Sequence, residues 1–410
     1  MTALLKTLCA ALAGATLLTA SLASAAPAVP KSGPKIGHVF VIVLENKGFA
    51  ETFGADSGAP YLARQLTKQG VLLTQYFGTA HYSLGNYLAM ISGQGGTRQT
   101  RDDCEVFEDF VSSGTTPDGQ ERGHGCVYPA HVRTLPDELS AIGKRWHGYM
   151  EDLGNDPTRE SATCGAPKLG ARDPTQQAGA PTTAVPQGDQ YTARHNPFVY
   201  FHSLIDGPAC ADNVVPLGRL QRDLKSVATT PEFVFISPNL CHDGHDAPCV
   251  THEPGGLVSA DAFLRIWVPR ILASPAYRRD GLLIVTFDEG DGEVSTLADG
   301  RTREVFEGAS CCAQQPGPNL GAFPETQSDA KYLTELHSFG GDRTGTVLLS
   351  PLLVPGTVSA TPFNHYSLLK TLEGLYGTGQ HLGYAGQAGL VGWFDAGSDV
   401  QVRRAAHAHR

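Results

Sequence analysis

Hydrophobic residues in this chain gather in short runs with little polar alternation. Two examples are HVFVIVL at 38–44 and LLIVTF at 282–287. Continuous Val, Ile and Leu runs of this length are typical of parallel strands that are buried on both faces. We therefore predict strands at 37–44, 71–77, 146–151, 198–203, 232–237, 281–287 and 345–350.

Between these runs, apolar residues recur with the spacing of amphipathic helices. Helices are predicted at 60–69, 84–92, 134–143, 214–227, 259–273 and about 365–376. Because strands and helices alternate, we expect an α/β fold with a doubly wound, mostly parallel sheet and helices on both faces. The sequence shows no repeat and no clear linker, so residues 36–395 are expected to form a single domain.

Three long stretches interrupt this rhythm, at 94–131, 153–196 and 291–342. They are rich in Gly, Pro, Thr and Asp, and they carry five of the nine cysteines. Loops of this length are usually functional or disordered, and disulfides would give them a fixed shape. We expect them to be disulfide-bearing insertions over the active edge of the sheet.

The composition is that of an ordinary globular protein, with 41% hydrophobic and 18% charged residues in 410. The formal net charge is −10, and no basic stripe is present, which argues against a nucleic-acid partner. An anionic substrate would therefore have to be attracted by the site itself, through a metal ion or a helix N-terminus.

The first 25 residues have the pattern of an export signal. Lys6 precedes an apolar stretch from Leu8 to Ala20, and Ala23-Ser24-Ala25 offers a cleavage motif. The apolar stretch is too short to span a bilayer, which takes about 20 residues. We expect cleavage after Ala25, a secreted or periplasmic protein, and no integral membrane segment in the mature chain.

The cysteines agree with export. Cys9 would leave with the signal, and the remaining eight form an even set suited to an oxidising compartment. Pairing cysteines that are near each other in the sequence suggests disulfides between Cys104 and Cys126 and between Cys241 and Cys249. The sequence alone cannot choose among the possible pairings. We expect the adjacent Cys311 and Cys312 to have separate partners, since a bond between neighbours is strained.

Two of the apolar runs end on polar side chains, at Glu45-Asn46 and at Asp288-Glu289. Open α/β sheets bind ligands beyond the carboxyl ends of their strands, so both pairs should meet at one edge. Carboxylates gathered without a counter-charge would repel or be protonated, and hard oxygen ligands suit a divalent cation. The alternative is that acids follow strands simply because strands end at the surface.

Ser83 lies where the segment HYSLGNYLAMISG begins a predicted helix. The helix dipole and the free backbone N–H groups there suit a phosphoryl oxygen. Serine is also a favoured N-cap residue, so capping alone could explain its position.

Five motifs resemble those of the phosphoesterase family of bacterial acid phosphatases and phospholipases C, within the alkaline phosphatase superfamily. In chain order they are VIVLENKGF, SLGNY, SPNLCHDGHD, TFDEGDG and FNHYSLLKTLEGLYG, spread over residues 38–376. Gly85 stands where the family usually has proline, and Lys47-Gly48 replace the more familiar Arg/His-Ser.

The resemblance implies a role for each matched residue. The catalytic residues would be Ser83, as nucleophile, with His245 and His365, which would bind phosphate or handle protons. The substrate-binding residues would be Asn86, Asn239 and His242, and the metal ligands would be Glu45, Asn46, Asp288 and Glu289. One or two divalent metal ions are implied as cofactors. Asp243, Asp246 and Asp291 are interpreted as turn residues, and His195 as one of the surface or packing histidines.

A serine hydroxyl must be activated by a base or a metal before it can attack phosphorus. We therefore predict a metal-dependent phosphomonoesterase that acts through a phosphoserine intermediate on a phosphate ester, with phosphoinositides among the candidate substrates. The alternatives are a phospholipase C that cleaves phospholipid headgroups and a non-catalytic extracellular binding protein. A sulfatase is disfavoured because no C/S-x-P-x-R motif is present.

Overall fold

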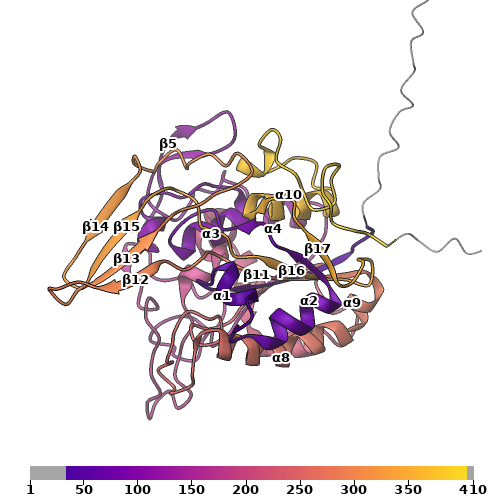
Figure 1. The fold of residues 1–410 in the computed structure, drawn as a ribbon, viewed down its shortest axis with the longest axis horizontal. Helices are drawn as coiled ribbons and strands as arrows, with labels where there is room; N and C mark the ends of the chain where they lie inside the picture. The colour runs from indigo at the N-terminus through magenta and orange to yellow at the C-terminus, as the bar shows by residue number, and fades with distance from the viewer. Residues whose placement is uncertain (1–33, 404–410) are drawn as a thin grey trace, which may run out of the picture. The chain divides into compact units, whose positions relative to one another are not determined.

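The computed structural model describes residues 34–403. An eight-stranded sheet forms the centre of the fold (Figure 1). Its strands, in spatial order, are β17 (Thr357–Ser359), β2 (Val71–Leu73), β16 (Thr346–Leu349), β11 (Gly281–Phe287), β1 (His38–Leu44), β10 (Phe233–Ser237), β7 (Trp146–Met150) and β9 (Val214–Pro216). All neighbouring pairs are parallel except those that β16 makes with β11 and β2. The doubly wound, mostly parallel sheet predicted from the sequence is therefore confirmed.

Strand β1 lies near the centre of this sheet because both of its faces are apolar, and every residue in it is buried. Val39, Val41 and Val43 belong to one core cluster, together with residues of α3 (Ser83–Ser92), α4 (Leu135–Ala141) and α10 (His365–Tyr376). The alternate residues of β1 belong to a second cluster with α8 (Gly256–Ala273) and α9 (Pro275–Asp280). Helices therefore cover both faces of the sheet, as Figure 1 shows.

The remaining helices are short. They are α1 (Phe49–Phe53), α2 (Thr67–Gln69), α5 (His202–Ile205), α6 (Ala209–Asn213) and α7 (Leu220–Asp223), with a π-helical turn at Leu62–Leu66 and 3₁₀ turns at Thr100–Asp102, Ala193–His195, Pro197–Tyr200, Leu217–Arg219 and Gly383–Gly386. Helix α10 matches its predicted bounds because both ends carry strong signals. Asn364 and Ser367 form a capping box at its start, and Gly377 ends it in the left-handed conformation.

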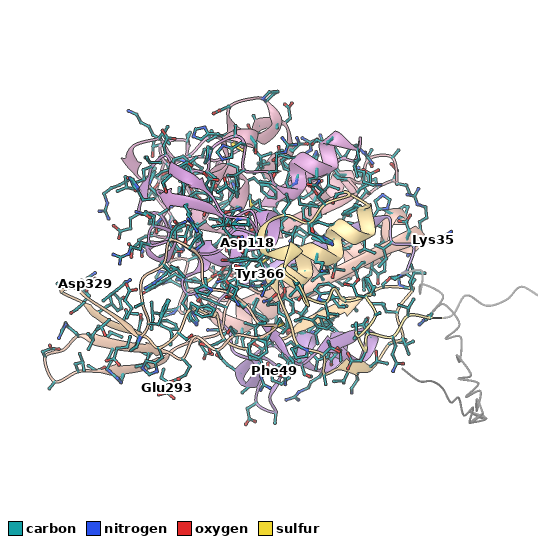
Figure 2. The ribbon with its side chains drawn as sticks, turned by 90° about the horizontal axis from the view of Figure 1, so that it is seen from above. Lys35, Phe49, Asp118, Glu293, Asp329 and Tyr366 are labelled. Carbon is teal, nitrogen blue, oxygen red and sulfur yellow. A yellow bond between two sulfur atoms is a disulfide. The ribbon has the colours of Figure 1, made fainter. Side chains whose placement is uncertain are left out.

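The insertion at 291–342 contains a second, four-stranded sheet instead of an irregular loop. Its strands are β12 (Glu293–Thr296), β13 (Thr302–Phe306), β15 (Tyr332–Leu336) and β14 (Glu325–Ser328), and it projects beside the main sheet (Figure 1). Three two-stranded pairs complete the fold, namely β3 (Tyr76–Phe77) with β18 (Phe363–Asn364), β4 (Val106–Phe107) with β8 (Ala171–Arg172), and β5 (Val111–Thr115) with β6 (Glu121–His124). We call the four-stranded sheet of β12, β13, β14 and β15 the small sheet. Figure 2 labels Glu293, the first residue of β12, and Asp329, which follows β14.

Two predicted elements are wrong. The run at 198–203 is helical: Pro197 opens a 3₁₀ turn and α5 follows, and Phe198, Val199 and Tyr200 are fully buried. The apolar residues of this run are therefore explained by their burial, and they do not indicate an extended strand. The segment 214–227 begins as the edge strand β9, which Pro216 ends, and only the short α7 lies within the rest.

Disulfides link Cys104 to Cys126 and Cys241 to Cys249, which confirms the two suggested pairs, and a third joins Cys164 to Cys210. The expectation that Cys311 and Cys312 have separate partners is wrong, because they pair with each other. The other six cysteines within residues 34–403 bond among themselves, so no separate partner remains in that range. The proposed export signal lies outside the described residues. No helix within residues 34–403 has both the length and the apolarity needed to cross a bilayer.

Gly78, which follows β3, lies where three backbone segments meet. A Cβ atom there would fall 2.7 Å from the carbonyl oxygens of both Asp288 and Gly341. We expect Gly78→Ala to lower the free energy of unfolding by about 1–3 kcal/mol, because backbone must move to make room. Urea denaturation measures this change.

Gly374→Ala is the matched control. This exposed residue of α10 has nothing within 4 Å of its would-be Cβ atom, so alanine should be neutral or stabilise by up to about 1 kcal/mol. Equal unfolding free energies for the two variants would contradict the crowding at Gly78.

Candidate active site

Three carboxylates meet where β1, β10 and β11 end. Glu45 follows β1, Asp288 follows β11, and Asp243 lies in the loop after β10, and all three are fully buried. Backbone hydrogen bonds fix this arrangement. The amide of Glu45 donates to the carbonyl of Asp243 at 2.9 Å, and the amide of Asn46 donates to Asp288 Oδ1 at 3.0 Å. The strand ends therefore converge as predicted.

Burial and mutual repulsion raise the pKa of these groups. Burial raises the pKa of Glu45 well above its usual range, with further contributions from Asp288 and Asp243. Burial also raises the pKa of Asp243, and that of Asp288 to about 6. Within residues 34–403, no lysine or arginine forms an ion pair with any of the three. The cluster therefore has no directly paired lysine or arginine, and the nearby Arg194 lowers the pKa of Asp243 only in part against the effect of burial.

His195 completes the cluster. Its Nδ1 lies 3.1 Å from Asp243 Oδ2, and its Nε2 lies 3.4 Å from Glu45 Oε2. One ligand atom from each of these three residues falls within 4.8 Å of the others. His195 Nε2 and Asp288 Oδ2 are buried without a hydrogen-bond partner. Carboxylate oxygens and an imidazole nitrogen left unsatisfied in this way fit a divalent cation.

Ser83 is the first residue of α3, and its side chain faces the cluster. The hydroxyl donates a hydrogen bond of 2.8 Å to Glu45 Oε2 and makes no capping bond to the helix. Tyr87, one turn later, donates to the other Glu45 oxygen at 2.5 Å. Capping alone therefore does not explain Ser83, which is 2% exposed and bonded to a candidate metal ligand.

The start of α3 is occupied by protein groups. Asp103 Oδ1 accepts from the Leu84 amide at 2.9 Å. Asn86 turns toward the preceding loop, where its Oδ1 accepts from the amides of Thr79 at 2.7 Å and Ala80 at 3.0 Å. The structure thus places Asn86 as a brace for the loop that carries Ser83.

Glu289 lies against His81 and Asp342. The His81 ring bonds to the Glu289 carboxylate through Nδ1 and lies 2.9 Å from Asp342 Oδ2 through Nε2. Burial alone would lower the pKa of His81, but these two carboxylates raise it to about 9. The ring of Phe306, from β13, lies 4.4 Å from the His81 ring, so the small sheet packs on the loop before Ser83.

His365 is fully buried beneath the same strand ends. Its Nδ1 is 3.0 Å from the Tyr76 hydroxyl, and its Nε2 bonds to the carbonyl oxygen of Asp288. Burial lowers the pKa of His365 to about 4. With both nitrogens engaged and the ring neutral, this geometry favours a structural role over proton transfer to a leaving group.

His245 lines a cleft of about 500 Å³ beside the cluster. Its Nε2 lies 3.5 Å from the Arg194 guanidinium, and its Nδ1 lies 2.8 Å from Asp246 Oδ1. Arg194 lines the same cleft and is 4% exposed, and its Nε makes no hydrogen bond but lies 3.7 Å from Asp103 Oδ2. These two side chains offer donors to an anion at the inner end of the cleft.

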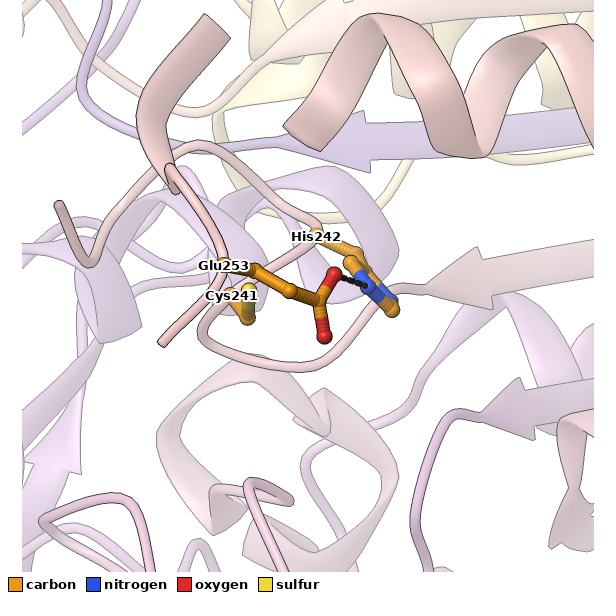
Figure 3. A group of neighbouring side chains, drawn as sticks. All are labelled: Cys241, His242 and Glu253. Atoms are coloured by element: carbon orange, nitrogen blue, oxygen red, sulfur yellow. Dashed lines mark hydrogen bonds and ion pairs between the residues drawn. The ribbon is translucent and has the colours of Figure 1, made fainter. Parts of the chain in front are cut away.

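His242 and Asn239 have other partners. The His242 ring lies between Glu151 at 3.0 Å and Glu253 at 3.1 Å, and Figure 3 shows the Glu253 contact. Asn239 accepts from the amides of Cys241 and His242 and so shapes the turn. Cys241, also drawn in Figure 3, has its sulfur in a disulfide, so this group has no thiolate for a metal.

Sequence reasoning missed His195 and Arg194, and it interpreted Asp243 only as a turn residue. Asp243 does accept from the His245 amide at 2.8 Å, as a turn residue would, while its other oxygen faces His195. His195 and Arg194 lie at the end of a long insertion, outside every matched motif. The sequence offered one signal for a functional site here: Arg194 and His195 are adjacent and come just before the buried apolar run at 198–203.

Comparisons with known proteins identify the family of the chain. The model of the phosphoesterase family matches residues 59–379. A phosphate-repressible acid phosphatase of Penicillium chrysogenum is 26% identical over 67% of this chain and 54% of its own length. A phosphatidylinositol-3-phosphatase of Mycobacterium tuberculosis is 28% identical over 83% of this chain and 92% of its own.

The chain spans about half the length of the fungal acid phosphatases that it matches. Among solved structures, a protein in the alkaline phosphatase superfamily from Vibrio parahaemolyticus aligns with a TM-score of 0.44 and 13% identity, over 85% of this chain and 68% of that one. The family match covers most of the sequence. The chain belongs to the phosphoesterase family.

Proposed function

We propose that this chain is a metal-dependent phosphoric ester hydrolase that acts on phosphate monoesters, with Ser83 as the nucleophile. The observation that carries the proposal is the hydrogen bond from the buried Ser83 hydroxyl to Glu45, beside Asp288 and Asp243. Relatives named acid phosphatase and phosphatidylinositol-3-phosphatase support the monoester reaction. An inositol lipid monoester is therefore one candidate substrate.

Glu45, Asp288, Asp243 and His195 are the residues best placed to hold one or two divalent ions. Asn46 and Glu289, predicted as ligands from the motifs, lie beside them. A bound divalent ion would supply positive charge to phosphoryl oxygens and lower the pKa of an attacking hydroxyl. The unsatisfied oxygen of Asp288 and nitrogen of His195 support this assignment.

The chain's own groups can carry the steps of the reaction. Ser83 Oγ attacks phosphorus while its proton moves toward Glu45, the P–O bond to the alcohol breaks, and a phosphoserine forms. Arg194 and His245 donate hydrogen bonds to the phosphoryl oxygens, and His245 supplies a proton to the departing alcohol. Water then attacks phosphorus as His245 takes its proton, the P–Oγ bond breaks, Glu45 returns a proton to Ser83 Oγ, and inorganic phosphate leaves. His365 has no proton-transfer step in this scheme.

Export of the protein belongs to the same proposal. All eight described cysteines are paired in disulfides, which is typical of proteins in an oxidising compartment. This pairing supports a secreted or periplasmic enzyme.

Ser83→Ala tests the nucleophile. We expect kcat for p-nitrophenyl phosphate to fall by at least about 10³-fold, since the group that forms the covalent intermediate is lost. Ser92→Ala, in the same helix, is the control, because its hydroxyl bonds only within the end of the helix. Retention of substantial activity in Ser83→Ala, with an unchanged thermal midpoint, would mean that the nucleophile is misassigned.

The same assay separates the reaction classes. Release of p-nitrophenol from the monoester, lost with chelator and restored by a divalent metal, is expected. Turnover of only a choline phosphodiester would favour a phospholipase C. No turnover of either ester by metal-loaded protein would favour a binding protein.

His195→Asn tests the metal ligands. Removing an imidazole that touches both Glu45 and Asp243 should weaken metal affinity by about 10–100-fold, measured by calorimetric titration of chelator-treated protein. The control is His131→Asn, because His131 is exposed and pairs only with Glu121. Equal affinities in the two variants would remove His195 from the site.

Asp288 gives a pH-dependent prediction. Its pKa rises from about 3.9 in the unfolded chain to about 6 in the fold, so the folded state binds the proton more tightly. In ion-free protein this contribution to stability is complete below about pH 4 and is lost as the pH rises through about 6. Asp288→Asn should therefore raise the thermal midpoint of chelated protein more at pH 7.5 than at pH 4.5.

The comparison with wild type at each pH is essential, because buried histidines such as His365 change stability in the opposite direction. Added divalent metal should also stabilise the wild type more at pH 7.5 than at pH 4.5. A midpoint difference between Asp288→Asn and wild type that does not change with pH would contradict the charged cluster.

A further inference from the structure

The cleft beside Ser83 is lined by more acidic than basic side chains. It has a volume of about 500 Å³ and lies between the loop that carries Ser83 and the small sheet. Among the described residues that line it, five are acidic and one is an arginine. An anion-binding site for a phosphate ester would ordinarily be lined by the opposite charge, so this excess of acid needs an explanation.

Arg194 and His245 are the basic groups nearest the carboxylate cluster. Arg194 is 4% exposed and adjoins His195 of that cluster, and its Nε lies 3.7 Å from Asp103 Oδ2, so Asp103 offsets part of its charge. Tyr82, immediately before Ser83, also lines the cleft. A phosphoryl group attacked by Ser83 would therefore lie at the Arg194 and His245 end, and its alcohol would extend along the rest of the cleft.

The small sheet forms one wall of that outer part. Glu304 pairs with Thr334, and both face the cleft, as does Tyr332. The intervening residues Arg303 and Glu335 bond to each other on the opposite face. Phe306 fixes the wall, because its ring lies 4.4 Å from the ring of His81 and 6.1 Å from that of Tyr82.

The outer end is acidic and aromatic. Asp102, Glu105 and Asp329 are exposed at the mouth. Glu105 pairs with Arg172 at 3.0 Å, whereas Glu304 has no ion-pair partner within residues 34–403. A neighbouring hollow of about 400 Å³ shares Asp102 and Glu105 with the cleft and adds Glu108. The rings of Tyr82 and Tyr332 line the same space, and aromatic faces beside carboxylates attract organic cations.

We propose that the cleft selects phosphate monoesters whose alcohol carries a positive charge, that is, phosphates of amino alcohols with an ammonium or quaternary ammonium group. Such a zwitterion places its phosphate at Arg194 and its cation among Glu304, Asp102 and the two tyrosines. Leaving groups that carry carboxylate or further phosphate are disfavoured by the same charges, so among the candidate substrates an amino-alcohol phosphate is preferred over an inositol lipid. This inference rests on the proposed phosphomonoesterase activity.

The test compares substrates that differ only in charge. Phosphocholine is compared with its uncharged isostere 3,3-dimethylbutyl phosphate, with 3-phosphoglycerate as the anionic substrate and p-nitrophenyl phosphate as the reference. We expect kcat/KM for phosphocholine to exceed that of the isostere by about 10-fold or more at low salt, and the preference to shrink in added NaCl.

Glu304→Gln and, independently, Asp102→Asn should each lower the ratio of phosphocholine to isostere by about threefold or more, as a carboxylate near the cation is neutralised. Glu293→Gln is the control, since Glu293 pairs with Val305 in the row of the small sheet that faces away from the cleft. It should leave the ratio unchanged.

The outcomes separate the two proposals. No turnover of the reference ester by metal-loaded wild type would overturn the phosphomonoesterase itself. Turnover of the reference with a phosphocholine to isostere ratio of one or below, or with 3-phosphoglycerate preferred, would overturn the charge selection alone. A high ratio that neither Glu304→Gln nor Asp102→Asn lowers would also overturn it.

Discussion

Three carboxylates buried side by side at the ends of β1, β10 and β11 are the constraint on which the active edge depends. Charges taken out of water are costly unless they are paired, and proteins otherwise neutralise them by holding protons. Glu45, Asp243 and Asp288 are fully buried, and their pKa values are raised accordingly. A cation bound beside these carboxylates would therefore be strongly stabilised. The Ser83 hydroxyl points into the same cluster, where it bonds to Glu45.

The two sheets have different roles in the proposed enzyme: the main sheet positions the reactive groups, and the small sheet shapes the cleft. Parallel strands of the main sheet bring the carboxylates together, and α3 presents Ser83 to them. The small sheet carries none of the groups proposed to react, but it packs on the loop before Ser83 through Phe306 and supplies one wall of the cleft. Substrate choice can then change with the insertion while the reactive groups stay in place.

The sequence predicted the parts of this protein that local patterns determine. The unbroken apolar runs of β1 and β11 identified the central strands, and Asn364 with Gly377 marked the ends of α10. The convergence of Glu45 and Asp288 followed from the rule that ligands bind at the carboxyl ends of parallel strands.

Contacts between distant segments were beyond the reach of those patterns. His195 reaches the carboxylates only because the insertion before it folds back onto β10, and no spacing in the sequence encodes that return. For Asn86 the motif position implied a contact with substrate. In the structure its side-chain oxygen instead accepts hydrogen bonds from the backbone amides of Thr79 and Ala80 in the preceding loop. The run at 198–203 was assigned as a strand because apolar periodicity alone does not distinguish a buried strand from a buried helical turn.

Anomalous diffraction from crystals grown with Mn²⁺ would show whether a divalent ion joins Ser83 to the buried carboxylates. At least one strong anomalous peak is expected within about 2.0–2.6 Å of oxygens from Glu45 and Asp288, and within reach of Ser83 Oγ. Peaks only elsewhere, or full Mn²⁺ occupancy with Ser83 turned away from the ion, would contradict this arrangement.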